Sequence, residues 1–152
     1  SIEFGEAVQK IEESAFEGCS NLGSITLPNT LVIIGDKAFR NTGLTSVKIP
    51  SSVVQIGTLA FNQCEALKAI TVDSNNPLFS DIDGVLCNKI KTILYHYPNA
   101  KGSDYAIPNT IVKIERYAIY DCKNLISLTI TASVSSIASD AIANCHSPNQ
   151  IT

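Results

Sequence analysis

The 152 residues are enough for one domain with a substantial buried core, and the 45% hydrophobic and 16% charged residues exclude a disordered chain. The net charge of −3 and the scattered Lys and Arg residues provide no basic surface for nucleic acid or an anionic membrane. No apolar stretch approaches the roughly 20 residues of a membrane-spanning helix, and no signal peptide is recognisable.

A repeated motif runs along the whole chain and is easiest to follow at one strand-like position. Successive occurrences of that position are 23, 22, 23, 35, 23 and 23 residues apart. So regular a period is typical of a solenoid, in which repeats stack because no single repeat can bury its own apolar residues. The position is occupied by Ile2, Ile25, Val47, Ile70, Tyr105, Leu128 and Ile151.

Each repeat predicts one short strand and one turn. Residues 25–27, 47–49 and 128–130 alternate apolar and polar side chains, which favours half-buried strands, and prolines end such segments at 28, 50 and, after residues 105–107, at 108. Stacked repeats would join these strands into a parallel sheet along one side, with about 4.8 Å between coils. On the opposite side an Ala-Phe pair recurs at 15–16, 38–39 and 60–61, and we expect the phenylalanines to stack inward as a ladder that continues with Ile119 and Ile142. The short stretches Ser14–Gly18 and Lys37–Arg40 predict one turn of α- or 3₁₀-helix.

One repeat, at about 73–104, is irregular and lacks the Ala-Phe pair. Two alternating runs, Asp83–Asn88 and Thr92–Pro98, flank the polar Lys89-Ile90-Lys91, so we expect a β-hairpin. The coil resumes at Tyr105. The predicted fold class is therefore an α/β, β-rich, right-handed solenoid in a single domain over 1–152, with a hairpin insertion.

The motif resembles a known family. The pattern Ile-Gly-x-x-Ala-Phe-x-x-Cys-x-x-Leu-x-x-Ile-x-Ile-Pro is nearly intact in Ile34–Pro50 and Ile56–Val72, and it is similar to the BspA-type (Treponema pallidum-type) leucine-rich repeat. The segment from Asp83 to Pro98 resembles a variant of the same family, with Cys87 where that variant usually has an aromatic residue. The resemblance implies a surface protein of bacteria or parasitic protists that acts as an adhesin.

Two groups of residues admit a metal or redox interpretation beside a structural one. Asp81 and Asp83 could open a calcium loop, but position twelve of that loop would be Thr92, so we favour an Asp-Gly turn. Cys19 and Cys64 would lie about 10 Å apart on alternate coils, beyond disulfide reach, whereas Cys122 and Cys145 could approach one another. Their shared place in the repeat favours buried thiols at Cys19, Cys64, Cys122 and Cys145.

The sequence offers little for catalysis. His146 follows Cys145, but this pair lacks the third residue and oxyanion site that a nucleophile requires, and His96 is expected on the hairpin surface. The glycines form no phosphate-binding pattern. We therefore expect no enzyme, no cofactor and no metal.

Two surfaces are candidates for binding a protein. The outward residues of the predicted sheet form a flat face of small polar side chains, and concave solenoid faces commonly bind partners. The hairpin tyrosines are the rival, since Tyr95 and Tyr97 share one of its faces, although neighbouring Phe79 and Tyr105 favour a role in sealing the core. The candidate contact residues are Ser24, Thr26, Ser46, Lys48, Thr71, Ser127, Thr129, Tyr95 and Tyr97.

Both ends of the sequence fall inside predicted strands, which predicts a fragment of a longer array. We expect a monomer, with end-to-end association through exposed terminal strands as a further outcome. The leading functional hypothesis is a non-enzymatic protein-binding module of a bacterial cell-surface or secreted protein, with host extracellular-matrix or plasma proteins as partners. The alternative is a structural spacer that presents another domain and binds nothing itself.

Overall fold

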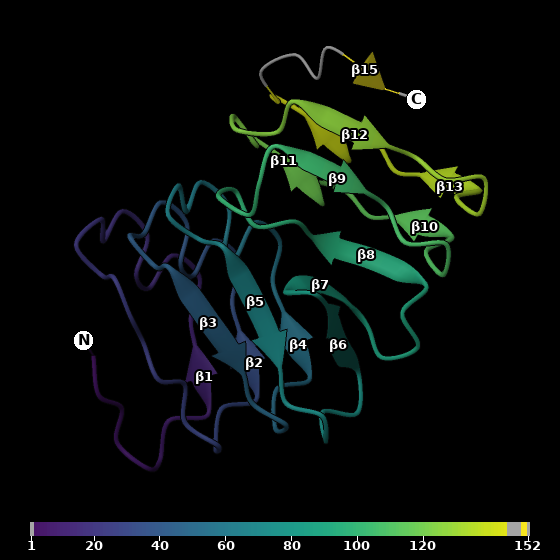
Figure 1. Cartoon of the computed structure of the whole chain (residues 1–152). Helices are drawn as coiled ribbons and strands as arrows, with labels where there is room; N and C mark the ends of the chain where they lie inside the picture. The colour runs from purple at the N-terminus through teal and green to yellow at the C-terminus, as the bar shows by residue number, and fades with distance from the viewer. Residues whose placement is uncertain (1, 146–149, 152) are drawn as a thin grey trace.

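The computed structural model describes residues 2–145 and 150–151. Within these ranges it contains fifteen short strands and no helix. The chain winds as successive coils from the N-terminal end to the C-terminal end of the molecule (Figure 1).

A row of parallel strands, here called the front row, occupies the side where the sequence predicts a sheet. Val47 pairs with Ile70, Leu128 pairs with both Tyr105 and Ile151, and Ile2 forms a bridge with Ile25, so the predicted register is confirmed at these positions. The row consists of β3 (Ser46–Ile49) and β5 (Ala69–Val72), followed by β9 (Asp104–Ala106), β12 (Ser127–Thr129) and β15 (Gln150–Ile151).

A second row of strands, here called the back row, was not predicted. It forms around the isoleucines Ile11, Ile34, Ile56 and Ile114, which recur once in each repeat and are mostly buried. The strands are only two residues long, except β8, so the alternation that reveals a strand is too short to recognise. They are β1 (Lys10–Ile11), β2 (Ile33–Ile34), β4 (Gln55–Ile56), β8 (Ile93–His96), β10 (Lys113–Ile114) and β13 (Ser136–Ile137).

The Ala-Phe segments form turns, so the expectation of short helices at Ser14–Gly18 and Lys37–Arg40 is wrong. Alternate N–H groups of the first two segments donate to the following coil, as Lys37, Phe39 and Asn41 do to the carbonyls of residues 58, 60 and 62, at 2.8–3.0 Å. Positive φ angles at Lys37 and Asn41 (54° and 55°) interrupt the helical conformation. In the last two coils this ladder is regular enough to form β11 (Ile119–Tyr120) and β14 (Ile142–Ala143), which pair in parallel.

The predicted phenylalanine ladder is confirmed. The rings of Phe16, Phe39 and Phe61 are stacked with interplanar angles of 4° and centroid distances of 5.3 and 5.4 Å. Phe39 and Phe61 are buried, and Ile119 is buried at the equivalent position. The ladder fixes the spacing between coils because each ring packs against the ring of the neighbouring coil.

The predicted hairpin is confirmed, with one more strand than expected. Strand β7 (Val85–Asn88) pairs antiparallel with β8, and also with β6 (Phe79–Ile82), which the sequence did not predict. Asp83 and Gly84 connect β6 to β7 with positive φ angles of 49° and 75°, the conformation of a two-residue type I′ turn. Strands β6 to β8 lie between the N-terminal and C-terminal halves of the molecule (Figure 1).

Strand β7 divides the hydrophobic core into two clusters. Leu86 packs with the buried residues of the first three coils, whereas Val85 and Cys87 pack with those of the later coils. Side chains alternate between the two faces of a strand, so β7 is covered on both of its faces. The irregular repeat therefore separates the core of the coils that precede it from the core of the coils that follow it.

Candidate functional site

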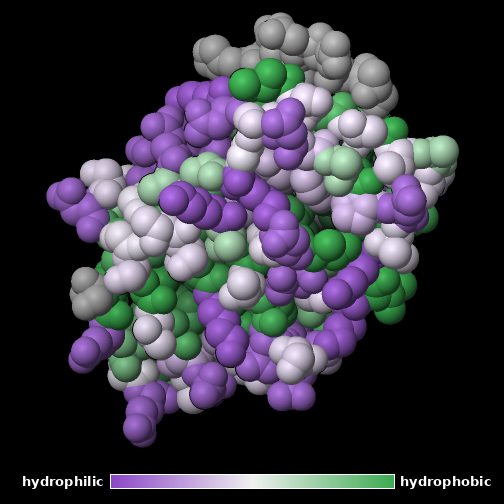
Figure 2. All heavy atoms as spheres, in the orientation of Figure 1, coloured by the Kyte–Doolittle hydropathy of each residue, from purple (hydrophilic) through white to green (hydrophobic). Residues whose placement is uncertain are grey.

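The outward residues of the front row lie where the sequence places them. Ser24, Thr26, Ser46, Lys48, Thr71 and Thr129 are exposed, and Ser127 is half-buried. They alternate with buried Val47, Ile49, Ile70 and Leu128, so their side chains point away from the core. On the side seen in Figure 2 hydrophilic residues are widely spread, and the hydrophobic areas are small and separate.

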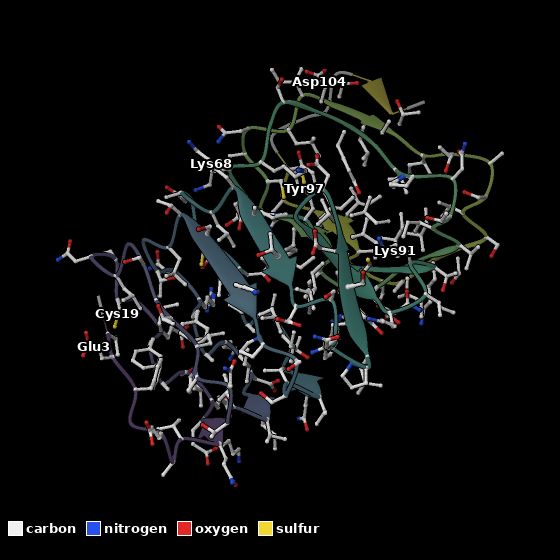
Figure 3. All side chains as sticks on the ribbon, turned by 60° about the horizontal axis from the view of Figure 1, so that its bottom comes forward. Glu3, Cys19, Lys68, Lys91, Tyr97 and Asp104 are labelled. Carbon is white, nitrogen blue, oxygen red and sulfur yellow. The ribbon has the colours of Figure 1, made fainter. Side chains whose placement is uncertain are left out.

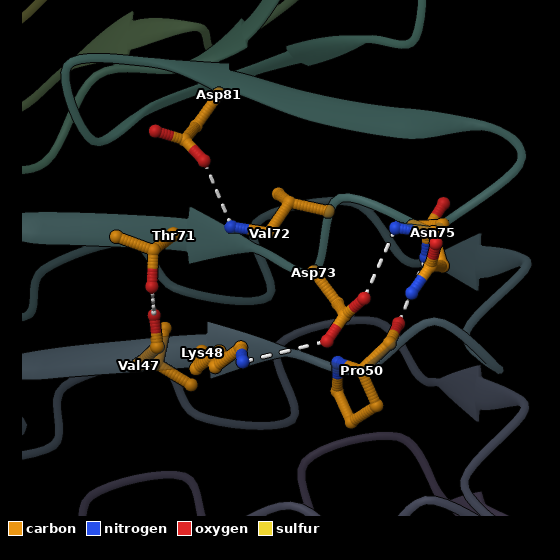
Figure 4. A network of polar contacts seen from close by, with 9 residues as sticks. Val47, Lys48, Pro50, Thr71, Val72, Asp73, Asn75 and Asp81 are labelled. Carbon is orange, nitrogen blue, oxygen red and sulfur yellow. Dashed lines mark hydrogen bonds and ion pairs between the residues drawn. The ribbon is translucent and has the colours of Figure 1, made fainter.

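Polar contacts hold Lys48 over the sheet (Figure 4). Its Nζ lies 3.4 Å from Asp73 Oδ2, and the other carboxylate oxygen accepts the backbone N–H of Asn75 at 3.0 Å. The Asn75 N–H, followed by Lys48, lowers the pKa of Asp73, so this carboxylate stays ionised at neutral pH. The positive charge of Lys48 therefore has a partner, and the front face presents little net charge here.

The hairpin turn closes the edge of β5. The N–H of Ile70 donates to Gly84 O at 2.8 Å, and the N–H of Val72 donates to Asp81 Oδ1 at 2.9 Å (Figure 4). Asp81 Oδ2 also accepts the N–H of Gly84 at 3.1 Å, which agrees with an Asp-Gly turn. Within residues 2–145 and 150–151, no three His, Cys, Asp or Glu side chains are grouped as metal ligands would be.

The two hairpin tyrosines have different environments. Tyr97 is 1% exposed, packs against Tyr105 with centroids 4.6 Å apart, and donates its hydroxyl to Gly102 O at 3.3 Å. Figure 3 shows it inside the molecule, while Asp104 lies at the upper edge of the view. Tyr97 is therefore a core residue, which corrects the prediction that it contacts a partner. Tyr95 is half-buried and packs edge-on against Phe79, with centroids 5.9 Å apart.

His96 is also buried, so its predicted place on the surface is wrong. It is 6% exposed, and burial lowers its pKa from 6.5 to about 4. The N–H of Tyr97 donates to Ala118 O as that of Phe39 donates to Ala60 O, so His96-Tyr97 occupies the place of an Ala-Phe pair. The irregular repeat thus has a turn equivalent to the others, with histidine at the alanine position.

The cysteines are free thiols, and two of the four that were predicted to be buried, Cys64 and Cys122, lie in the core. Cys145 is half-buried, and Cys19 is exposed, so the prediction of a buried thiol is wrong for Cys19. Contact with Cys145, together with burial, raises the pKa of the Cys122 thiol. Burial raises the pKa of Cys87 to about 11, and this residue packs in the second core cluster.

A groove that the sequence did not predict lies where the regular coils meet the irregular repeat. It has a volume of about 440 Å³, within the range of small ligand-binding pockets. Two buried polar atoms, Asn62 Nδ2 and His96 Nε2, belong to residues that line it, and within residues 2–145 and 150–151 neither has a hydrogen-bond partner. The lining consists of residues 54–62, Phe79, Leu86, Tyr95, His96 and residues 115–117.

An apolar shelf continues the groove. A second hollow of about 390 Å³ shares Val54, Phe79 and Tyr95 with the first, and also includes Leu78 and Ile90. Val54, Leu78 and Ile90 are 44%, 49% and 74% exposed, which is unusual for large aliphatic side chains that lie together. The groove and this shelf form one continuous feature beside β4.

Comparison with known proteins identifies the family. The chain matches the BspA type leucine rich repeat region in six copies, over residues 1–93 and 88–152. It therefore belongs to the BspA-type leucine-rich-repeat family, as the motif indicates. Members of this family share a scaffold built from stacked leucine-rich repeats.

Three solved structures show the same fold. A leucine-rich repeat protein of Eubacterium ventriosum is 35% identical with a TM-score of 0.82, over 90% of this chain and 37% of that protein. A leucine rich cell surface protein of Faecalibacterium prausnitzii is 35% identical with a TM-score of 0.80, over 93% of this chain and 38% of that protein. The pneumococcal vaccine antigen PcpA is 27% identical with a TM-score of 0.79, over 95% of this chain and 42% of that protein.

The chain spans less than half the length of each of these three proteins. A comparison with curated proteins gave no match. No helix in the described residues is long and apolar enough to cross a membrane.

Proposed function

We propose that this chain is a non-enzymatic protein-binding module of a bacterial cell-surface or secreted protein, which adheres to proteins on host or microbial surfaces. The proposal is supported by the family and by two structural relatives, one described as a cell surface protein and the other as a pneumococcal vaccine antigen. The partner class is a host extracellular-matrix or plasma protein, or a surface protein of another microbe.

The observation that best supports binding is the regular, exposed front face. Lys48 lies opposite Thr71 and Ser127 lies opposite Asp104 in parallel register, so polar side chains recur at the spacing of the coils. Short side chains permit close approach of a partner, and the buried residues beneath hold the face rigid, which lowers the entropic cost of binding. Tyr95, at the groove, supplies an aromatic contact that the front face lacks.

A second candidate function is a spacer that presents another domain. One observation favours it: the candidate contact residues of the front face include no Trp, Tyr or Arg, the residues that contribute most to protein binding. The spacer differs from the adhesin in a single measurable property, which is binding.

The test is saturable capture of the chain on immobilised extracellular-matrix and plasma proteins. Thr71→Arg and Thr129→Arg place bulk and charge on the front face, and Tyr95→Ala removes the aromatic side chain at the groove. Thr110→Arg is the matched control, since Thr110 is also exposed but lies outside the front row. Loss of capture in a front-face variant or in Tyr95→Ala, with Thr110→Arg unaffected, supports adhesion. Absence of capture on all surfaces, with the circular dichroism spectrum intact, favours the spacer.

A further inference from the structure

The groove lies along an unpaired main-chain edge. In the first two coils, the turn N–H groups donate to the next coil, as those of Lys37 and Phe39 do to Thr58 O and Ala60 O at 3.0 and 2.8 Å. The equivalent N–H groups of the third coil belong to Leu59, Phe61 and Gln63. These three find no acceptor among the residues that the structure describes.

Two carbonyl groups at the same edge, one just before β4 and one in it, are also unpaired within the described residues. Val32 O and Ile34 O accept N–H groups from the following coil, at 2.8–3.3 Å, and so does Val112 O. In the part of the chain that the structure describes, Val54 O and Ile56 O at the equivalent positions accept none. The third coil thus presents acceptors along β4 and donors along the turn that follows.

The third coil has this unpaired edge because of the way the hairpin strands pair. One side of β8 pairs with β10 and the other with β7, where Leu94 lies opposite Cys87, so β8 has no free edge for β4. Phe79 and Leu86 of the hairpin face the groove with their side chains instead. On the front row the same interruption is closed by Asp81 and Gly84, whereas no such cap covers β4.

Two side chains add unfulfilled hydrogen-bonding capacity at the same place. Asn62 and His96 are 2% and 6% exposed and both line the groove, and Asn62 Nδ2 and His96 Nε2 have no hydrogen-bond partner among the described residues. Buried polar groups in native proteins are nearly always paired, so such a pair beside a groove indicates a ligand that completes them. Glu115 and Arg116 contribute opposite charges to the lining, and Arg116 is already paired with Asp140 at 2.9 Å, which favours a ligand without large net charge.

We propose that the groove binds an extended peptide segment of a partner protein, which pairs through its main chain with β4 and the turn at 57–63. Addition of a strand to an exposed edge is an established mode of peptide recognition, in which main-chain hydrogen bonds give affinity and side-chain pockets give specificity. One polar side chain of the segment bonds with Asn62 and His96, and an aliphatic side chain packs on Val54, Leu78 and Ile90. This inference rests on the proposed protein-binding function and assigns it a site and a form of partner.

The experiment uses linear heptapeptides displayed on phage, selected on the chain, followed by fluorescence polarisation with the enriched peptides as synthetic probes. Val54→Arg blocks the unpaired edge. Val112→Arg is the matched control, because Val112 has the same place in its repeat, is 42% exposed against 44% for Val54, and has a paired carbonyl. We expect Val54→Arg to weaken binding about tenfold or more and Val112→Arg to leave it unchanged.

A second variant distinguishes a loss of peptide binding from a loss of folding. Asn62→Leu removes an amide whose nitrogen has no partner in the part of the chain that the structure describes, so it should weaken peptide binding without lowering the midpoint of thermal unfolding. Bound peptide should also slow amide hydrogen exchange at Leu59, Phe61 and Gln63. No enriched peptide, equal binding by the Val54→Arg and Val112→Arg variants, or unchanged exchange at these amides overturns the inference.

The outcomes separate this inference from the proposed function. Capture on matrix or plasma proteins that survives Val54→Arg leaves adhesion standing and rejects the groove as its site. Peptide binding at the groove without capture on any of those proteins supports the groove and contradicts the adhesive function.

Discussion

Replacement of His96 by glutamine should make the stability of this fold less sensitive to acid. Burial lowers the pKa of His96 from 6.5 to about 4, and desolvation is its cause. Between these two pH values the unfolded chain binds a proton at His96 that the folded chain does not, so the free energy of unfolding falls as the pH falls. The difference between these two pKa values corresponds to about 3 kcal/mol of unfolding free energy, a large part of the stability of an ordinary domain. This contribution is fully present above pH 6.5 and is lost by about pH 4.

The assay is urea unfolding followed by circular dichroism at pH 7, 5.5 and 4, with linear extrapolation to water. The wild-type chain should lose about 3 kcal/mol more than the His96→Gln variant between pH 7 and 4. Carboxylates with lowered pKa values, such as Asp73, contribute equally to both proteins and cancel. Equal losses in wild type and His96→Gln would show that His96 is not held neutral in the fold.

Three further predictions concern the core and the hairpin. Phe39→Ala should lower the free energy of unfolding by about 3–5 kcal/mol, because this buried ring is stacked on both faces; a urea-denaturation loss below 1 kcal/mol would contradict the ladder's role. In the native protein Cys19 should react rapidly with a thiol reagent such as DTNB and Cys64 only on unfolding, which mass spectrometry of labelled peptides measures. Gly84→Ala should cost about 2–3 kcal/mol in thermal or chemical unfolding, since its φ is 75° and a Cβ would lie 2.7 Å from that of Ala69; wild-type stability would refute this turn geometry.

Some of the site could be found in the sequence and some could not. The small polar residues of the front face were predicted because they alternate with apolar residues whose burial fixes their direction, as at Lys48 between Val47 and Ile49. Tyr97 and His96 were misplaced for the same reason. Tyr97 was placed with Tyr95 on one face of the hairpin and His96 on the hairpin surface, but the equivalence of His96-Tyr97 with Ala-Phe appears only when the hydrogen bond to Ala118 is seen.

The sequence by itself determined the repeat, the family and the register. In a stacked solenoid each residue lies beside its counterpart one repeat later, so a period of 22 or 23 residues sets the pairing of Val47 with Ile70 and of Tyr105 with Leu128. Only the tertiary structure decided how the irregular repeat is accommodated. The apolar run at Val85–Cys87 is compatible with several partners, and its pairing with β8 depends on burial against two separate core clusters. That non-local choice leaves the edge of β4 opposite β2 unpaired and opens the groove, because both edges of β8 are occupied by β7 and β10.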